Sequence, residues 1–342
     1  MFVGAVATVL RSGFGAVNTA GVPGLTTLRR APGAGGICLG RGGSGAGGDF
    51  LSALSDLKGN CPIHVSRGYS LPAWFDATWL VLATSHSGNT EETVSAAQTA
   101  LDKGATVVVI ASGGHLAGLP ETSERCYLIP TVGGQPPRTA FGHIFSRQLS
   151  FLEALGLLPG MGDAERNAML LRLQEHNEHF DILNNPEGDI ALLASSLMEQ
   201  PIAVIGPKEL SPVLTRFKNQ MNENAARLVR IGVLPEMNHN ESVAWGGIGE
   251  EADPEAANQA LLLLTWEGMR PRVRQRLDWM VAHASTETAW NLTGEGGTLL
   301  EVLLYHCLVM DWLSTTLALL RGKDPAAIAP ISSLKDHLNS IQ

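Results

Sequence analysis

A cluster of small polar residues lies at 85–90, in the segment "SHSGNTEET", where its types and spacing could hold an anion. The apolar run at 78–84 predicts a strand that ends just before the cluster. Residues 90–104 predict a helix, because two glutamates stand in its first turn and Lys103 and Gly104 close it. Free backbone N–H groups at the start of such a helix carry partial positive charge. The junction therefore predicts a site for a phosphate group.

Hydroxyl side chains at this junction strengthen the prediction. Ser85, Ser87 and Thr90 would each offer a donor to a phosphate, and Gly88 would allow the backbone to approach it closely. The alternative is capping of the helix by Asn89 or Thr90, which needs one such side chain and does not explain the others. Ser85, Ser87 and Thr90 are therefore the phosphate-binding candidates.

A second glycine-rich segment, "GRGGSGAGGD" at 40–49, follows a short apolar run. It contains G-x-G-x-x-G, the pattern of dinucleotide sites, but the abundance of glycine makes this match weak. A dinucleotide site would also need an acidic residue at the end of the next strand, where Ser66 and Arg67 stand instead. The segment predicts a loop that binds phosphate or sugar, with Gly43 and Ser44 as its candidates. A flexible turn is the alternative.

Strand and helix patterns alternate along the chain, and this order predicts the fold class. Apolar, β-branched runs such as "ATVVVIAS" predict strands that are buried on both faces. Short loops join them to helices, which predicts an α/β fold with two subdomains, each a parallel sheet flanked by helices. The expected parts are an N-terminal arm or helix at 1–35, a first subdomain with the phosphate loop at 36–155, a helical linker at 156–190, a second subdomain at 191–322 and a C-terminal helical tail at 323–342.

Composition limits the partners of the protein. The 342 residues include 24 Lys and Arg against 33 Asp and Glu, a formal net charge of −9, and no basic tract. Nucleic acid and anionic membranes are therefore poor partners, while a local site can still bind an anionic small molecule. The four cysteines are scattered, which predicts reduced thiols in a cytoplasm rather than a zinc site or disulfides. The N-terminus lacks a basic residue before its apolar stretch and is expected to be an arm rather than a targeting segment.

Neither a membrane span nor a metal site is expected elsewhere in the chain. The most apolar run, 298–320, is interrupted by three polar residues, Glu301, His306 and Asp311. A buried helix accommodates such residues better than a membrane span does. His176 and His179 are three residues apart on a polar helix, but no third ligand accompanies them, so a solvent-facing pair is expected.

Several segments together resemble the bifunctional phosphoglucose/phosphomannose isomerase family, a branch of the phosphoglucose isomerase superfamily built from sugar isomerase (SIS) domains. "SHSGNTEET" is similar to the S-x-S-G-x-T phosphate loop of these domains, and "GRGGSGAGGD" to the family's first glycine–serine loop. "PPRTAFG", "NQMNENAAR", "LPEMNHNE", "MDWLSTTLALLRGKDP" and "ISSLKDHL" resemble its further motifs in the same order. The resemblance implies two SIS-type subdomains.

This resemblance implies an aldose–ketose isomerase that interconverts glucose 6-phosphate and fructose 6-phosphate through a cis-enediol, without metal or other cofactor. It implies Glu223 as the group that moves a proton between C2 and C1, acting as general base and then acid. Asn222 and Asn224 beside it predict a polar pocket. Arg138 would be the positive group that stabilises the enediolate oxygen.

Two more residues follow from the resemblance. His239 would transfer a proton to or from the ring oxygen during ring opening, and Lys335 would assist that step. In the superfamily this histidine reaches the site of the neighbouring subunit, which implies a homodimer with shared active sites. Glu236 is the second choice for the base.

Other functions stay open. A non-catalytic SIS regulator that senses phosphosugars would need the phosphate loop but not Glu223, His239 and Lys335. An amino-sugar phosphate isomerase or deaminase is a rival enzyme, and a nucleotide-dependent oxidoreductase is disfavoured by the missing ribose acid. Use of mannose 6-phosphate is also open, because family members with that activity are associated with a C-terminal threonine and the tail at 324–335 has none. His86 stands where the family commonly has an aromatic residue such as Tyr.

Overall fold

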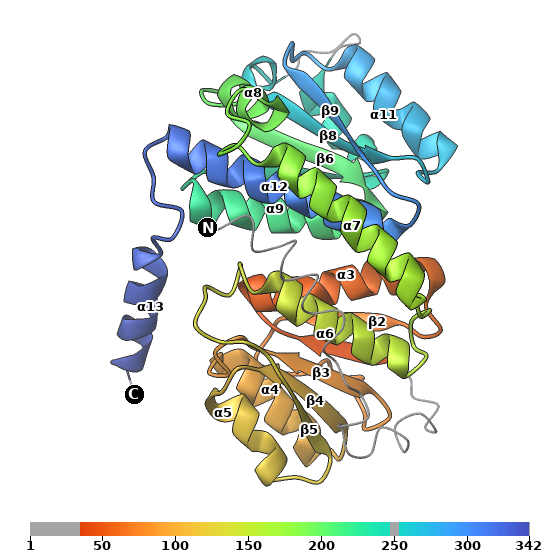
Figure 1. Cartoon of the computed structure of the whole chain (residues 1–342), viewed down its shortest axis with the longest axis vertical. Helices are drawn as coiled ribbons and strands as arrows, with labels where there is room; N and C mark the ends of the chain where they lie inside the picture. Colours follow the sequence, from red (N-terminus) through yellow and green to blue (C-terminus); the bar gives the residue numbers. More distant parts are fainter. Residues whose placement is uncertain (1–34, 247–252, 342) are drawn as a thin grey trace. The chain divides into compact units, whose positions relative to one another are not determined.

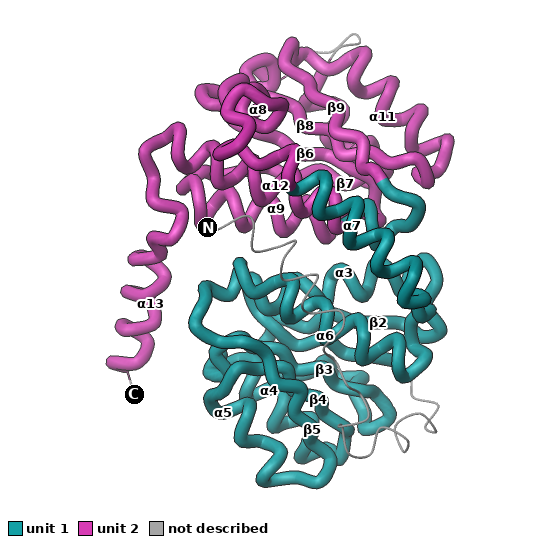
Figure 2. The backbone as a smooth tube through the Cα atoms, viewed as in Figure 1, with its two compact units in different colours: residues 1–177, 296–303 teal, residues 178–295, 304–342 magenta. Residues whose placement is uncertain are grey.

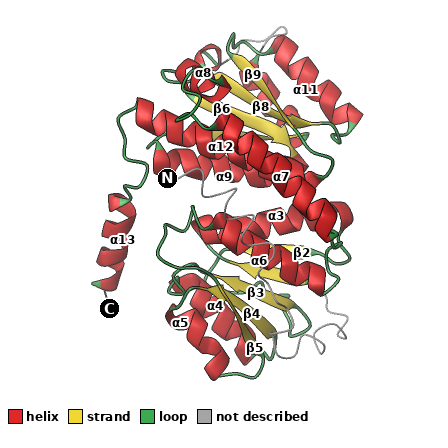
Figure 3. Ribbon diagram, in the orientation of Figure 1, coloured by secondary structure: helices red, strands yellow, loops and turns green. Residues whose placement is uncertain are grey.

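The computed structural model describes residues 35–246 and 253–341, which fall into two compact units (Figure 2). Unit 1 comprises residues 1–177 and 296–303, and unit 2 comprises residues 178–295 and 304–342. Each unit is built on its own parallel sheet flanked by helices, so the predicted fold class is confirmed (Figure 3). The expected N-terminal arm or helix lies outside the described residues, which begin at Gly35.

The sheet of unit 1 has five strands in the order β2-β1-β3-β4-β5, and all neighbouring strands are parallel (Figure 1). Its central strands are almost fully buried, as expected for a parallel sheet covered on both faces. The elements in chain order are β1 (Gly36–Leu39), α3 (Gly42–Lys58), β2 (Ile63–Ser66), β3 (Leu80–Thr84), α4 (Glu91–Asp102), β4 (Thr106–Ala111), α5 (Gly114–Gly118), η2 (Leu119–Glu121), β5 (Cys126–Pro130), α6 (Phe141–Ala154) and α7 (Asp163–Phe180).

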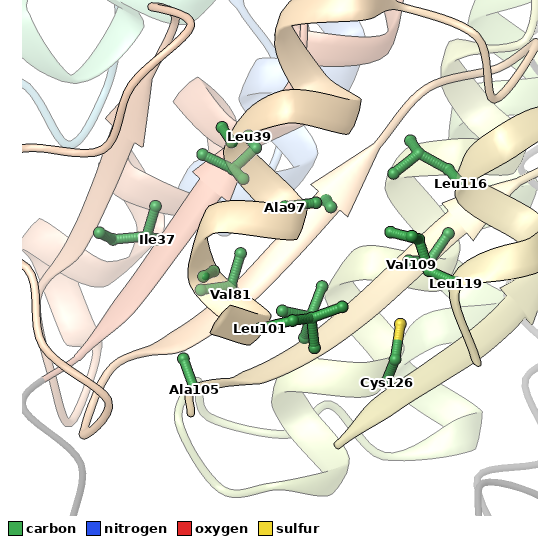
Figure 4. Close-up of a cluster of buried hydrophobic side chains, with 14 of the residues drawn as sticks. Ile37, Leu39, Val81, Ala97, Leu101, Ala105, Val109, Leu116, Leu119 and Cys126 are labelled. Atoms are coloured by element: carbon green, nitrogen blue, oxygen red, sulfur yellow. The ribbon is translucent and has the colours of Figure 1, made fainter. Parts of the chain in front are cut away.

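Helices cover both faces of this sheet, because alternate strand residues point to opposite sides. On one face Val81 and Val109 pack in a cluster of buried side chains with Leu101 of α4 (Figure 4). On the other face α3 packs against α6, where the ring centroids of Phe50 and Phe141 are 5.0 Å apart. This packing fixes the strand ends from which the phosphate loop and its neighbouring loops emerge.

Helix α3 begins at Gly42, inside the segment that the sequence predicts as a loop or flexible turn. The predicted loop conformation is therefore wrong, whereas binding of phosphate or sugar by this segment stays a prediction. The glycines serve close packing. A Cβ on Gly45 would lie 2.6 Å from the carbonyl carbon of Gly40, and one on Gly48 would lie 2.8 Å from the Cβ of Cys38. The first turns of α3 can therefore pack directly against β1 only without side chains.

The sheet of unit 2 has four parallel strands in the order β7-β6-β8-β9. Strand β8 is buried along its whole length, whereas β9 lies at the edge and is mostly exposed. The elements in chain order are α8 (Asp189–Ser196), β6 (Ile202–Pro207), η3 (Lys208–Leu210), α9 (Ser211–Asn224), β7 (Val229–Leu234), η4 (Glu236–His239), α10 (Glu241–Trp245), η5 (Ala256–Asn258), β8 (Ala260–Trp266), α11 (Pro271–His283), β9 (Ala289–Gly294), α12 (Leu299–Leu320) and α13 (Ala329–Asn339).

Helix α12 is long and apolar enough to cross a membrane by length and composition, but 89% of its most apolar window is buried within the protein. Its polar interruptions all have protein partners. Glu301 pairs with Arg172 at 2.6 Å, Asp311 pairs with the buried Arg216, and the His306 ring bonds a backbone carbonyl of β8 at 3.2 Å. Burial lowers the pKa of His306 to about 4. These contacts are those of a core helix, as predicted.

Candidate functional site

The candidate phosphate site lies where the strands of unit 1 end. Strands β1, β3, β4 and β5 are parallel, so the segments that follow them meet at one edge of the sheet. Ligands of open α/β sheets bind outside this edge. The segments at this edge carry the sequence-predicted residues 43–44, 85–90 and 138.

Two of the predicted hydroxyls face each other in the loop between β3 and α4. The Ser85 side chain is buried, and its Oγ lies 2.9 Å from Oγ1 of Thr90. The N–H of Gly88 donates to Ser85 Oγ at 3.1 Å, which holds this serine in place. Ser87 lies on the exposed side of the same loop, where its Oγ accepts the N–H of Asn89 at 3.3 Å. The structure therefore brings Ser85 and Thr90 together and leaves Ser87 at the surface.

The N-terminus of α4 has no side-chain cap. Thr90 occupies the cap position without a capping hydrogen bond, and the Asn89 side chain accepts the N–H of His115 at 3.0 Å instead. Within the described part of the chain, the N–H groups of Thr90, Glu91 and Glu92 have no acceptor. Neither Asn89 nor Thr90 therefore caps the helix, which was the alternative to phosphate binding. This helix end thus offers several free donors to an anion.

The structure shows a second reason for a glycine at position 88, which the sequence did not indicate. Its φ is +74°, a conformation that favours glycine, and a Cβ there would lie 1.7 Å from the carbonyl oxygen of Gly113. The missing side chain therefore permits close packing between the phosphate loop and the loop that follows β4.

Ser44 connects the glycine-rich segment to the phosphate loop. It lies in the first turn of α3, is buried, and accepts the N–H of His86 on its Oγ at 3.0 Å. The preceding residue, Gly43, packs against the segment after β5, because a Cβ on it would lie 2.7 Å from the backbone nitrogen of Arg138. Arg138 itself is only 5% exposed, so it is not a surface arginine. Gly43, Ser44 and Arg138 therefore belong to the same edge of unit 1 as Ser85 and Thr90.

Arg41 is a residue of this edge that the sequence did not single out. Its guanidinium donates to the carbonyls of Gly40, Ser66 and Gly68 at 3.1, 3.4 and 2.8 Å. It also lies 3.8 Å from a carboxylate oxygen of Glu92, in the first turn of α4. The positive charge of Arg41 partly offsets the negative charge of Glu92 near the proposed phosphate. The sequence signal was an arginine two residues after a predicted strand, which is too common to be informative.

Glu223 lies in unit 2, half-buried in the last turn of α9. Arg216 lies earlier on this helix and is buried. Burial alone lowers the pKa of its guanidinium, but the negative charges of Asp311 and, more weakly, Glu223 raise it, and the net pKa is above the ordinary value. The predicted polar pocket of Asn222 and Asn224 is not formed as expected, since Asn222 is exposed and Asn224 is buried with its amide donating to a serine of α12 at 3.0 Å. Each helix residue is rotated by about 100° from the one before it, so Asn222 and Asn224, two residues apart, point in nearly opposite directions.

His239 ends the short helix η4, which follows β7, and its side chain is exposed. The side-chain amide of Asn238 beside it donates to the Ser242 hydroxyl at 3.5 Å, while its side-chain oxygen Oδ1 is buried without a partner among the described residues. Glu236, the second choice for the base, is also exposed. The turn after β7 therefore presents the histidine to solvent rather than packing it in the core.

Lys335 lies on α13, the predicted C-terminal helix. No residue of this helix is buried, and Ile331, Leu334 and Leu338 also leave much of their surface exposed. The structure does not bring Lys335 into contact with Glu223 or His239 of the same unit.

Comparisons with known proteins identify the family. Residues 187–338 match the family model of the bacterial phospho-glucose isomerase C-terminal SIS domain. A bifunctional phosphoglucose/phosphomannose isomerase of Aquifex aeolicus is 31% identical over 311 residues, which cover 88% of this chain and 89% of that protein. A protein of the same name from Caldicellulosiruptor bescii is 29% identical and covers 90% of each chain.

A solved structure shows the same fold. The C-terminal domain of glucosamine-fructose-6-phosphate aminotransferase from Francisella tularensis superposes with a TM-score of 0.73, covering 94% of this chain and 95% of that one at 12% identity. That likeness concerns the fold alone, whereas the sequence relatives span both units of the chain. The resemblance indicated by the motifs is confirmed, and the chain belongs to the bifunctional phosphoglucose/phosphomannose isomerase family.

Proposed function

We propose that this protein is an aldose–ketose isomerase that interconverts glucose 6-phosphate and fructose 6-phosphate. The observation that carries the proposal, within this family, is the Ser85–Thr90 hydroxyl pair at the uncapped start of α4. Hydroxyls and free helix N–H groups can bind a phosphate dianion without a lysine. Ser44, Ser87 and the backbone at Gly43 complete the proposed phosphate subsite.

Glu223 is the proposed proton carrier. Its carboxylate removes the proton from C2 of the open-chain aldose, and the released electrons form a C1–C2 double bond while the C1 oxygen takes a proton from water. The product is a cis-enediol. Glu223 then returns its proton to C1 as the C2 hydroxyl gives its own proton back to the solvent and becomes the ketone. The guanidinium of Arg138 would stabilise the negative oxygen that develops in each direction.

We assign ring opening to His239 and Lys335. We also propose that the active form of the protein is a homodimer. Both side chains are exposed in the isolated chain, which is consistent with their serving a site that is completed in the assembly. In this proposal His239 reaches the site of the partner subunit. A cytoplasmic location is part of the proposal, since phosphosugars are substrates found there. Light scattering should give the mass of a dimer at micromolar concentration, and a fully active monomer would contradict the shared site.

Product analysis tests the proposed activity. The purified protein is incubated with fructose 6-phosphate without added cofactor, and the sugars are identified by NMR; a parallel sample receives glucosamine 6-phosphate. Formation of glucose 6-phosphate in the first sample alone supports the proposal. Turnover confined to the amino sugar would favour an amino-sugar enzyme, and binding without turnover in either sample would favour a regulator.

Mannose 6-phosphate is the proposed minor product. The enediol has lost the stereocentre at C2, so rotation about C2–C3 before reprotonation gives mannose 6-phosphate instead of glucose 6-phosphate. Residues 326–329 of the tail, Ala-Ala-Ile-Ala, stand in the region where family members with mannose activity are associated with a threonine, and they offer no hydroxyl to order the substrate. We therefore expect mannose 6-phosphate to form more slowly in a time course from fructose 6-phosphate. Equal initial rates would show that the missing threonine does not matter.

A further inference from the structure

His86 joins three segments at the site edge of unit 1. Its backbone N–H donates to Ser44 of α3 at 3.0 Å. Its carbonyl accepts both the N–H and the hydroxyl of Ser112, after β4, at 3.0 and 2.6 Å. Its ring Nε2 lies 3.0 Å from the carbonyl oxygen of Val132, after β5. A carbonyl can only accept, so Nε2 carries the proton. His86 is 6% exposed, which makes these bonds costly to lose.

The segment that His86 holds leads directly to Arg138. Its start is fixed, because Arg147 of α6 donates to the carbonyl of Pro130 at 2.7 Å and the N–H of Thr131 donates to β4 at 3.0 Å. Beyond Val132 come two glycines, one of them with φ +85°, so the backbone there is intrinsically free. The ring of His86 bonds the segment at Val132, immediately before this free stretch.

The far end of this segment, at Arg138, packs against α3, the helix whose Ser44 bonds the backbone of His86. The backbone of Arg138 packs on Gly43, next to Ser44, so α3, His86 and residues 132–138 form a closed ring of contacts. A phosphate loop and an arginine segment joined in this way keep one relative geometry.

We propose that His86 is a positioning residue for Arg138. Its ring holds the segment 132–138 against the phosphate loop, so that the guanidinium meets the developing enediolate oxygen when the sugar phosphate is bound. This inference rests on the proposed function of the site. In this proposal the ring of His86 acts through Val132 and the arginine segment rather than on the substrate.

A kinetic experiment tests this role. His86→Phe keeps a planar buried ring but removes the donor, while its backbone N–H still reaches Ser44. We expect kcat for fructose 6-phosphate to fall about tenfold, the usual effect of one hydrogen bond, with KM changed less than about twofold. His86→Gln places an amide N–H near the position of Nε2 and should recover most of the lost rate. His86→Asn, whose shorter amide does not reach Val132, should not recover the rate. This variant takes the place of His86→Phe if His86→Phe does not fold.

Combination with an Arg138 variant separates positioning from a general loss of structure. In an Arg138→Ala background, His86→Phe should change kcat by less than about twofold, because the residue through which it acts is gone. An undiminished tenfold effect in that background would overturn the proposal. So would an unchanged kcat in the otherwise intact enzyme.

Hydrogen exchange tests the clamp even if the protein has no isomerase activity. The amides of Thr139 and Ala140 bond carbonyls of Pro136 and Pro137 at 3.0 to 3.2 Å, just after the segment that His86 holds. They should exchange faster in His86→Phe than in His86→Gln, while amides inside α4 stay equally protected in both. Equal exchange of Thr139 and Ala140 in the two variants would overturn the proposal. An inactive wild-type protein with the expected exchange difference would instead contradict only the proposed function.

Discussion

Replacement of Thr90 by valine separates phosphate binding from helix capping. Valine has nearly the same shape and the same β-branching, so the change removes little but the hydroxyl. That hydroxyl lies 2.9 Å from Ser85 Oγ and makes no capping bond to α4. Loss of a helix cap typically destabilises a protein by about 1 kcal/mol. Here we expect the free energy of unfolding to change by less than about 1 kcal/mol, because no cap is lost.

The cost should appear in substrate binding instead. A hydrogen bond to a charged group contributes about 1.5–3 kcal/mol. At about 1.4 kcal/mol per factor of ten, this raises KM for fructose 6-phosphate about 10- to 150-fold, with kcat little changed. The assays are initial rates across substrate concentration and urea unfolding of the same preparations. Thr99→Val is the matched control, since that exposed hydroxyl of α4 bonds only the carbonyl of Ser95 at 2.9 Å. An unchanged KM together with a loss of stability near that of a lost cap would refute the reasoning.

Three further predictions concern unit 2. Glu223→Gln should lower kcat about 10²–10⁴-fold with little effect on KM, while the control Glu236→Gln stays near wild type; the reverse pattern in initial-rate assays would assign the base role to Glu236. Asp311→Asn should destabilise the protein by about 3–5 kcal/mol in urea unfolding, because it removes the carboxylate charge that pairs with the buried guanidinium of Arg216; a change below about 1 kcal/mol would contradict this. Burial lowers the pKa of His306 to about 4, whereas the unfolded chain has the ordinary value of about 6.5. Between these two pH values the unfolded state therefore binds one more proton than the folded state. The free energy of unfolding should fall by up to about 3 kcal/mol as the pH drops through this window. His306→Gln should flatten that dependence, and an equally steep curve for the variant would show that other groups cause it.

The fold was predictable wherever patterns were strong and local. The helix predicted at 90–104 agrees with α4 (Glu91–Asp102), because an acidic first turn marks its start and a glycine marks its end. Gly104 follows α4 with φ +82°, as its position after the helical pattern indicates. Strand β9 (Ala289–Gly294) was missed because an exposed edge strand needs no continuous apolar run. The early start of α3 was missed because glycine is a poor helix former, and only packing against β1 makes it the suitable residue.

The candidate site was predictable in the parts that are close together in sequence. The Ser85–Thr90 pair lies within six residues, so a single loop brings the two hydroxyls together. The contacts of His86 with Val132 and of Arg41 with Glu92 join residues about fifty positions apart. They depend on which strands are neighbours, and no local pattern contains that information. Roles of Glu223, His239 and Lys335 came from family resemblance and stay predictions.

Solvent deuterium incorporation tests the central claim most directly. The protein is incubated with fructose 6-phosphate in D₂O without added cofactor, and the products are followed by NMR. Proton transfer through an enediol exchanges the carried proton with solvent, so glucose 6-phosphate should form with deuterium at C2, and the Glu223→Gln variant should lose conversion and labelling together. Conversion without any deuterium at C2, or labelling that persists unchanged in Glu223→Gln, would contradict an enediol mechanism based on this carboxylate.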